Sequence, residues 1–290
     1  MVARTTSCAS KYRMRVGRYI AVYTVTLLGA FLASAQKTSS VSSQHSEGRA
    51  KQMIEAAVRS ELAAADHDHT VWTFRDHDKT TEKDAVYEEV DTPVGSVRRM
   101  IELNRHPLDS DSTQRETQRI NDFLHDPSFR LKQQKASAHD DEQASALLKM
   151  LPEAFIWTLK SETGDLATLS FRPNPGFHPP NMEARVMSIM AGELVIAKAD
   201  NRIRTLRGAL SDDVKIGYGV LGKLRRGGTF DVERREIAPH IWQITETHVH
   251  IDGRALLFKT IGQQEDEVKT EWKPSSAKTL EDAAKQLGAG

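Results

Sequence analysis

A glycine-rich stretch in the second half of the chain has the spacing best suited to bind phosphate. Residues 217–222 read Gly-Tyr-Gly-Val-Leu-Gly, a G-x-G-x-x-G pattern that Lys223 extends to nearly a P-loop. A nucleotide site also needs Ser or Thr after the lysine and a helix that starts at the loop. Leu224 stands in place of that hydroxyl, and two arginines and two glycines follow it. The pattern therefore favours a flexible flap at the mouth of a cavity over a nucleotide site.

Five residues of this flap are candidates for contact with a ligand or partner: Tyr218, Leu221, Lys223, Arg225 and Arg226. The basic members are suited to lipid phosphates or to an acidic partner. Ordinary solvated surface charge is the simpler interpretation.

Several histidines lie close together in sequence and raise the question of a metal. His248 and His250 are two residues apart in a strand-like segment, so both imidazoles project from one face. Two imidazoles are a weak candidate site for zinc or copper. Surface histidines are the favoured interpretation, and we expect no metal or other cofactor.

Hydrolytic and covalent chemistry find little support in the sequence. The nucleophile-elbow pattern G-x-S-x-G does not occur, and the acidic runs at residues 140–142 and 265–267 are typical of solvated faces. The single cysteine, Cys8, lies in a segment that we expect to be removed. We therefore expect a binding protein rather than an enzyme.

The first 35 residues have the order of a secretory signal peptide. Five basic residues and no acid precede an apolar run at residues 19–32, which ends in Ala33-Ser-Ala35. The run is shorter than the roughly 20 residues of a spanning helix. We expect cleavage near Ala35, a periplasmic location and no stable membrane span afterwards, with an uncleaved anchor as the alternative.

Charge limits the classes of partner. The whole chain has 40 basic and 40 acidic residues, but five of the basic ones precede residue 36, so the exported part carries five more acids than bases. A nucleic-acid-binding surface spread over the protein is therefore not expected.

Periodicity predicts the elements that position these groups. Residues 36–46 are rich in Ser, Thr and Gln and predict a flexible leader, and residues 47–65 repeat apolar residues as an amphipathic helix. Strands are expected at 70–76, 84–91 and 94–103, followed by a highly charged helical insert at 108–151. Within this insert, Pro127 and Pro152 are predicted to end two helices.

From residue 153 the strand signal persists for about a hundred residues. Strands are expected at 155–159, 167–171, 183–190, 193–199, 202–206, 229–237, 242–251 and 254–261. Residues 266–290 are interpreted as a C-terminal tail that includes a short helix or frayed piece at 277–287. About 10 to 11 antiparallel strands in one chain favour a strongly curved sheet. The predicted class is α+β, with residues 47–265 forming one half-open barrel covered by helices.

Large apolar residues of these elements form the candidate ligand cavity. They are Trp72, Phe74, Phe123, Leu147, Phe155, Trp157, Phe171, Met187 and Trp242. Such residues fill a core as readily as they line a cavity, and the sequence leaves both interpretations open.

Residues 92–108 and 223–237 are similar to segments of exported bacterial proteins labelled outer membrane lipoprotein-sorting proteins. With the order of elements, the chain resembles the superfamily of periplasmic outer-membrane lipoprotein carriers, the LolA/LolB-like half-barrels, over most of residues 47–261. The resemblance implies an apolar cavity that shelters an acyl chain, with a lipid or acylated protein as partner. The alternative is an envelope protein-interaction module that binds no lipid.

Overall fold

The computed structural model describes residues 25–216, 222–255 and 263–289. It divides into two units, residues 1–45 and 46–290, and the second unit holds the sheet. Helix α1 covers Val25–His67, so residues 36–46, predicted as a flexible leader, are helical. Whether residues 1–35 act as a signal peptide stays a prediction, since residues 1–24 lie outside the described part.

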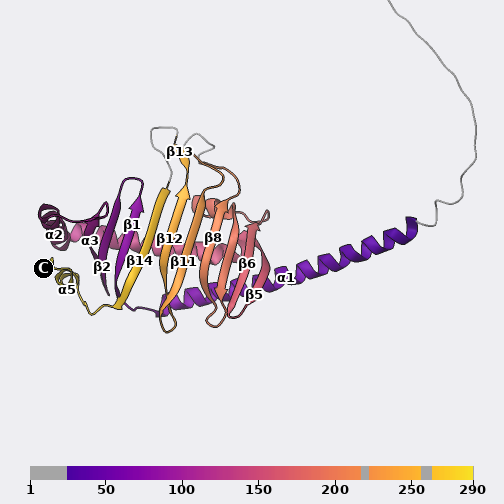
Figure 1. Ribbon diagram of the computed structural model, residues 1–290, viewed down its shortest axis with the longest axis horizontal. Coiled ribbons are helices and arrows are strands. Elements are labelled where there is room, and N and C mark those ends of the chain that lie inside the picture. Colours follow the sequence, from indigo (N-terminus) through magenta and orange to yellow (C-terminus); the bar gives the residue numbers. More distant parts are fainter. Residues whose placement is uncertain (1–24, 217–221, 256–262, 290) are drawn as a thin grey trace, which may run out of the picture. The chain divides into compact units, whose positions relative to one another are not determined.

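The second unit is an α+β structure dominated by antiparallel strands (Figure 1). The strands are β1 (Trp72–Thr80), β2 (Asp84–Thr92), β3 (Gly95–Leu103), β4 (His106–Pro107), β5 (Phe155–Thr163), β6 (Leu166–Pro173), β7 (Met190–Ala197), β8 (Arg202–Leu210), β9 (Val214–Ile216), β10 (Gly222–Leu224), β11 (Thr229–Ala238), β12 (Ile241–Ile251), β13 (Gly253–Ala255) and β14 (Gln263–Pro274). The remaining helices are α2 (Ser110–His125), α3 (Pro127–Ala154), α4 (Met182–Ser188) and α5 (Leu280–Gln286).

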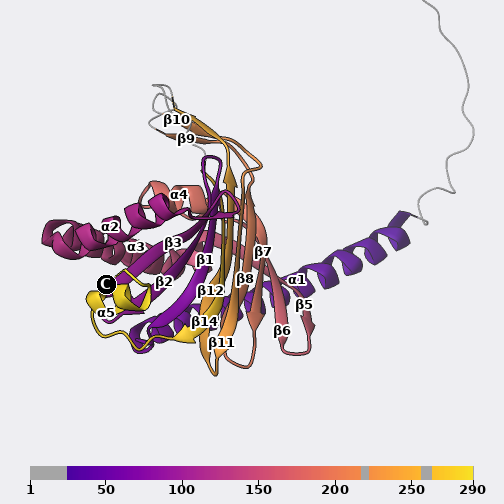
Figure 2. The same ribbon diagram turned by 60° about the vertical axis from the view of Figure 1, so that its left-hand side comes forward.

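Eleven strands form one sheet in the order β4-β3-β2-β1-β14-β12-β11-β8-β7-β6-β5. The sheet is strongly curved and is not closed into a barrel (Figure 2). Strands β9, β10 and β13 form a separate small sheet. The large antiparallel sheet that the sequence predicts is therefore confirmed.

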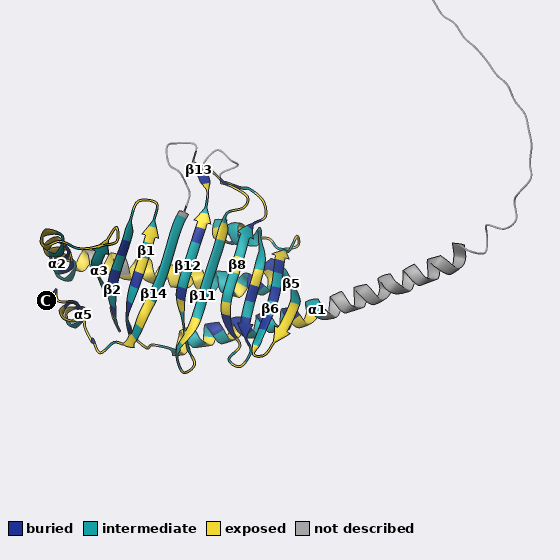
Figure 3. Ribbon diagram, viewed as in Figure 1, coloured by how far each residue is buried: buried dark blue, intermediate teal, exposed yellow. Residues whose placement is uncertain are grey.

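One cross-strand row shows how the character of the sheet changes on the face covered by α1 and α3, which we call the inner face. From β5 to β1 this row runs Leu159, Leu169, Leu194, Leu206, Val232, Thr247, Glu267 and Asp78. Along this row the inner face is apolar from β5 to β11 and polar from β12 to β1. Figure 3 shows more buried residues around β5 to β7 than on β11 and β14.

The apolar half of the inner face forms a packed core. Ile54 and Ala57 of α1 and Leu151 of α3 pack on buried side chains of β5 to β8, including Leu169 and Leu194. The spacing of apolar residues within 47–65 therefore gives the stripe that covers the sheet, as predicted.

The opposite, outer face carries a row of charges. Across the strands this row runs Glu193, Arg207, Asp231, His248, Asp266 and Lys79. Arg207 Nε donates to both oxygens of Asp231, at 3.0 and 2.9 Å. Cross-strand pairs of opposite charge stabilise a solvated sheet face.

A second core lies at the β3 end of the sheet. Val90 of β2 stands opposite Thr73 of β1, so by strand alternation it points to the outer face, where it packs with Leu280 of α5 and Ile120 of α2. Helix α2 also covers the edge of β3, since Glu116 accepts a hydrogen bond from the Met100 amide at 2.8 Å. The edge is thereby protected from pairing with another chain.

Three further predictions are wrong. Residues 183–190, predicted as a strand, lie mostly in α4, because the Asn181 side chain caps the Ala184 amide at 2.8 Å. Residues from 266 onward, predicted as a tail, form most of β14, which is a central strand, although the short helix expected within 277–287 is confirmed as α5. Pro152 does not end its helix, which continues to Ala154. Of the strand expected at 254–261, only residues 254–255 lie in the described part.

Candidate functional site

Helix α3 spans the inner face and buries nothing over its middle. It begins beside α2 near β3 and ends at the start of β5, the opposite edge strand. Its 28 residues extend about 42 Å, close to the roughly 43 Å between β3 and β5 at ordinary strand spacing. Over residues 131–142, every residue whose burial is described is exposed. We call this segment the strap.

The strap is held at its two ends. At the N-terminal end, Gln134 donates a hydrogen bond to the Val94 carbonyl oxygen at 3.1 Å, and Arg130 lies 3.9 Å from Glu281. At the C-terminal end, Leu148 and Leu151 pack into the core under β5 to β8. These contacts lie towards the two ends of α3, which also contacts α4.

Aromatic side chains gather on the inner face where it becomes polar. Phe74 of β1 stacks on Trp272 of β14 with ring centroids 4.5 Å apart, and Trp72 meets the same indole edge-on at 6.3 Å. Trp72 and Phe74 are buried, and the Nε1 of Trp72 has no hydrogen-bond partner. A buried, unpaired N–H costs free energy unless a ligand or water accepts from it.

Charged groups stand next to this aromatic cluster. Asp76, 1% exposed, accepts a hydrogen bond from Arg98 at 3.2 Å through Oδ2, while its Oδ1 has no partner. The Arg98 guanidinium also lies 3.7 Å from the centre of the Tyr87 ring, within reach of a cation–π contact. Burial raises the pKa of Asp76 to about 6; Glu267 adds to the rise, and Arg98 opposes it.

Asp91 is the second perturbed acid of this region. Burial raises its pKa to about 6, Glu89 adds to the rise, and a hydrogen bond from the Trp72 amide at 3.3 Å opposes it. The aromatic cluster is therefore bordered by two carboxyl groups that titrate well above the ordinary range of an aspartate.

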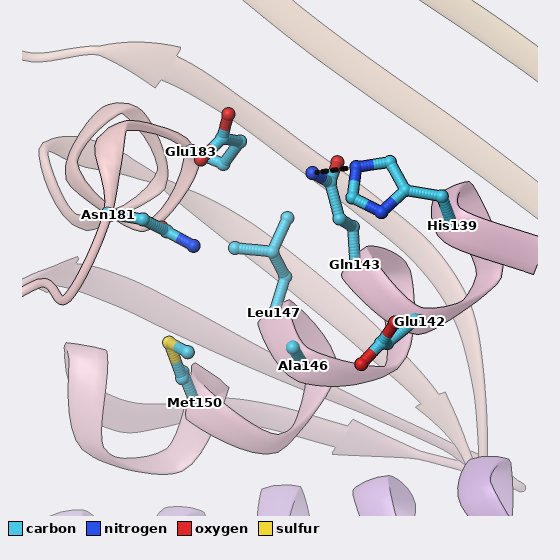
Figure 4. Close-up of a pocket in the computed structure, with 8 residues that line it drawn as sticks. All are labelled: His139, Glu142, Gln143, Ala146, Leu147, Met150, Asn181 and Glu183. Carbon is cyan, nitrogen blue, oxygen red and sulfur yellow. Dashed lines mark hydrogen bonds between the residues drawn. The ribbon is translucent and has the colours of Figure 1, made fainter. Parts of the chain in front are cut away.

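Two pockets lie along α3. The first, of about 270 Å³, is lined by His139, Glu142, Gln143, Ala146, Leu147, Met150, Asn181 and Glu183 (Figure 4). The second, of about 390 Å³, lies between α3 and the β2–β3 turn and includes Val94, Phe123 and Leu280 in its lining. Both are near the lower limit of ligand pockets, about 300 Å³, and both have charged linings.

The nine residues predicted to line one cavity lie in five places. Phe155, Trp157 and Phe171 pack against one another, with Phe155 and Phe171 rings 4.7 Å apart, and Met187 packs on the same core. Trp72 and Phe74 belong to the aromatic cluster on β1. The other three are separate: Phe123 packs against the second core at the β3 end of the sheet, Leu147 lines the first pocket, and Trp242 lies near Asp200.

The structure gives the predicted flap only in part, because Tyr218 and Leu221 lie outside the described residues. Lys223 of β10 forms an ion pair with Asp213, so its charge is compensated. Arg225 and Arg226 are exposed in the turn after β10. Since Gly222–Leu224 is a strand paired with β9 and β13, the lysine does not lead into a helix as in a P-loop.

The structure brings His248 and His250 together with Asp266, a member of the acidic run at residues 265–267. Asp266 Oδ1 lies 2.7 Å from His248 Nδ1 and 2.9 Å from His250 Nε2. The hydrogen bond with His248, followed by that with His250, lowers the pKa of Asp266. These residues form a hydrogen-bonded cluster on the outer face.

Sequence reasoning missed Trp272 as a member of the inner-face site. Trp272 lies in a strongly charged stretch that reads as a tail, and its partners on β1 are almost 200 residues away in the sequence. The alternation of Trp72, Phe74 and Asp76 on one strand is the one signal that pointed to this face.

Among the described residues, no helix is long and apolar enough to cross a membrane. Neither a protein-family model, nor a curated protein, nor a solved structure matches this chain. The site therefore rests on its own geometry.

Proposed function

We propose that this chain is an exported binding protein that holds an acyl chain or another lipid between the strap and the inner face of a half-open barrel. In this proposal, residues 1–35 direct export and are removed near Ala35, and the mature protein acts in the periplasm as a lipid carrier or sensor. The observation that carries the proposal is helix α3, which is about as long as the sheet is wide and whose central segment, the strap, is exposed.

The inner face under the strap has the composition that an amphiphile needs. In the cross-strand row that runs from Leu159 to Asp78, the apolar residues end at Val232 on β11, and the polar residues begin at Thr247 on β12 and Glu267 on β14. An acyl chain would lie at this boundary, beside Val232, and a polar head group near the aromatic cluster, where Trp72 Nε1 lacks a partner. Each buried methylene contributes about 0.8 kcal/mol, so binding requires no catalytic or metal motif.

The strap would have to move for such a ligand to enter. The core under β5 to β8 is packed, and the two pockets along α3 are too small and too charged for a long chain as they stand. Gln134 and Arg130 make single contacts that release easily, whereas Leu148 and Leu151 form a buried anchor. The proposal therefore includes rotation of α3 about its C-terminal end.

The test is native mass spectrometry of protein recovered from a bacterial periplasm, followed by organic extraction and lipid analysis. We expect an added mass that extraction converts into free lipid. A protein that carries no lipid and does not bind a fluorescent fatty acid would overturn the proposal.

A second candidate is supported by the filled interior. An envelope protein-interaction module needs no cavity, and Phe155, Trp157 and Phe171 fill the space that a deep acyl site would require. Val94 lines the second pocket and Leu131 begins the strap, and both side chains are exposed. They would then belong to the partner surface. Stoichiometric capture of one envelope protein by cross-linking in cells, with no bound lipid, would favour this function.

A further inference from the structure

Two turns at one end of the sheet bring three metal-ligating side chains together. Asp200 lies in the turn between β7 and β8, Glu236 near the end of β11, and His240 in the turn between β11 and β12. Strand β11 runs antiparallel to its neighbour β8, with Thr205 opposite Glu233, so both turns reach the same end of the sheet. One ligand atom from each of the three residues lies within 4.8 Å of the others.

Hydrogen bonds already orient this cluster. His240 Nδ1 lies 2.9 Å from Asp200 Oδ1, and the His240 amide donates to Glu236 Oε1 at 2.7 Å. Trp242 Nε1 donates to the other oxygen of Asp200 at 3.4 Å.

We propose that Asp200, Glu236 and His240 form a binding site for a divalent transition metal such as Cu²⁺, Ni²⁺ or Zn²⁺. Metal–ligand bonds of about 2.0–2.2 Å place ligand atoms of one ion within the separation seen here. The imidazole selects a transition metal over Mg²⁺ or Ca²⁺, which prefer oxygen ligands. The cluster is open to solvent on the His240 side, where the imidazole is 82% exposed, so water completes the coordination.

The site differs from the two-histidine cluster on the outer face. His248 and His250 share one oxygen of Asp266 as hydrogen-bond partner. Both histidines lie on β12 and Asp266 lies on the neighbouring strand β14, so this cluster is not at the turns.

Trp242 provides a direct reporter for the test. Cu²⁺ or Ni²⁺ is added to the full chain, prepared without a polyhistidine tag, while tryptophan fluorescence is recorded and bound metal is measured by equilibrium dialysis. We expect one ion per chain with quenching of part of the emission from the four tryptophans. Trp242→Phe should remove most of the quenching and keep one bound ion.

Two variants test the ligands without disturbing the fold. His240 has a φ of +63°, which asparagine tolerates, so His240→Asn removes the imidazole and keeps the turn. Asp200→Asn removes the charge at constant shape. Each should weaken Cu²⁺ binding about tenfold or more and abolish the metal-dependent rise in the thermal unfolding midpoint.

His248→Ala/His250→Ala is the matched control, and it should leave both the quenching and the affinity unchanged. The proposal is overturned if His240→Asn binds Cu²⁺ as tightly as the parent chain. It is also overturned if the control double variant loses the ion, or if no stoichiometric binding is found.

Discussion

Single residues on the inner face combine burial with incomplete hydrogen bonding. Asp76, Arg98 and Trp72 each have a buried polar atom without a partner in the structure. Such groups weaken the folded state, and binding sites tolerate this cost because a ligand or water removes it. The raised pKa of Asp76 has the same origin, since burial penalises its charged form.

The pH dependence of stability follows from this shift. Asp76 has a pKa of about 6 in the folded protein against an ordinary value of 3.8, so the folded state binds the proton more tightly. Its contribution to stability is therefore full below pH 3.8 and is lost as the pH rises towards 6. The loss amounts to roughly 2–3 kcal/mol for this residue, and Asp91 acts in the same direction.

Urea unfolding between pH 4 and pH 7 measures this loss (about 1.4 kcal/mol per pKa unit). In Asp76→Asn, the fall in the free energy of unfolding between pH 4 and pH 7 should be about half of that in the parent chain. Asp91→Asn should reduce the fall by a similar amount. Glu153→Gln, at an exposed position, is the control and should leave the pH profile unchanged. An unaltered profile in Asp76→Asn would contradict the assignment of the raised pKa.

At the scale of elements, α1 is fixed to the sheet by a buried ionic cluster. Glu61 accepts the Ile203 amide at 2.8 Å and pairs with Arg202 at 2.9 Å and with Arg234. The side chains of Glu61 and Arg202 are less than one-tenth exposed. Two arginines share one carboxylate, so loss of that carboxylate leaves uncompensated charge in the interior.

Glu61→Ala should lower the free energy of unfolding by about 3–5 kcal/mol, the cost of breaking a buried ion pair. The matched control is Glu153→Ala, which breaks the exposed pair between Lys51 of α1 and Glu153 at the end of α3 and should cost less than about 1 kcal/mol. Chemical denaturation of the two variants checks the difference. Equal losses would show that the cluster does not hold α1.

Helix α5 is an integral part of the second unit. Leu280, Ala283 and Ala284 are buried against β2 and β3, and Arg99 donates a hydrogen bond to the Leu287 carbonyl. Leu280→Ala should cost about 2–4 kcal/mol because it opens a cavity in this core. Leu131→Ala, at a position 51% exposed on the strap, should change stability by less than about 0.5 kcal/mol. Equal effects in denaturant titrations would contradict the burial of α5.

Helices and strands were predictable where the spacing of apolar residues showed which side of the element is buried. Apolar spacing predicted the part of α1 that covers the sheet, and alternation predicted β1, β2 and the hairpin of β5 and β6. Strand β14 was missed because both of its faces carry mostly polar and charged residues. Its sequence therefore lacks the alternation of apolar and polar residues by which a strand is recognised. Helix α4 was mistaken for a strand because the Asn181 cap outweighs the apolar character of Val186 and Met187.

For the whole molecule, the sequence indicated the large antiparallel sheet but not the pairing that builds the sites. The aromatic cluster joins β1 to β14, and the proposed metal ligands join two turns through the neighbours β8 and β11. Such pairings depend on register over long sequence separations, which local periodicity does not determine. The fold accordingly divides the nine predicted cavity residues among several places.

The inner face differs in packing between its two ends. The half from β5 to β8 is filled by the core under α1, and the half from β12 to β1 is polar and lies beyond that core. The strap runs across both. If the proposed lipid binds here, entry depends on the N-terminal contact of the strap between Gln134 and Val94.

The most direct test of this account locks the strap and measures ligand uptake. In a Cys8→Ser background, Val94→Cys/Gln134→Cys is joined by a cleavable bismaleimide, and Lys51→Cys/Glu153→Cys is joined in the same way as a control at the fixed end of α3. Binding of dansyl-undecanoic acid is then titrated before and after cleavage. We predict that the lock at Val94 and Gln134 lowers affinity at least about tenfold, reversibly, and that the control lock has no effect. Equal binding by the locked and released forms would contradict a ligand site beneath α3.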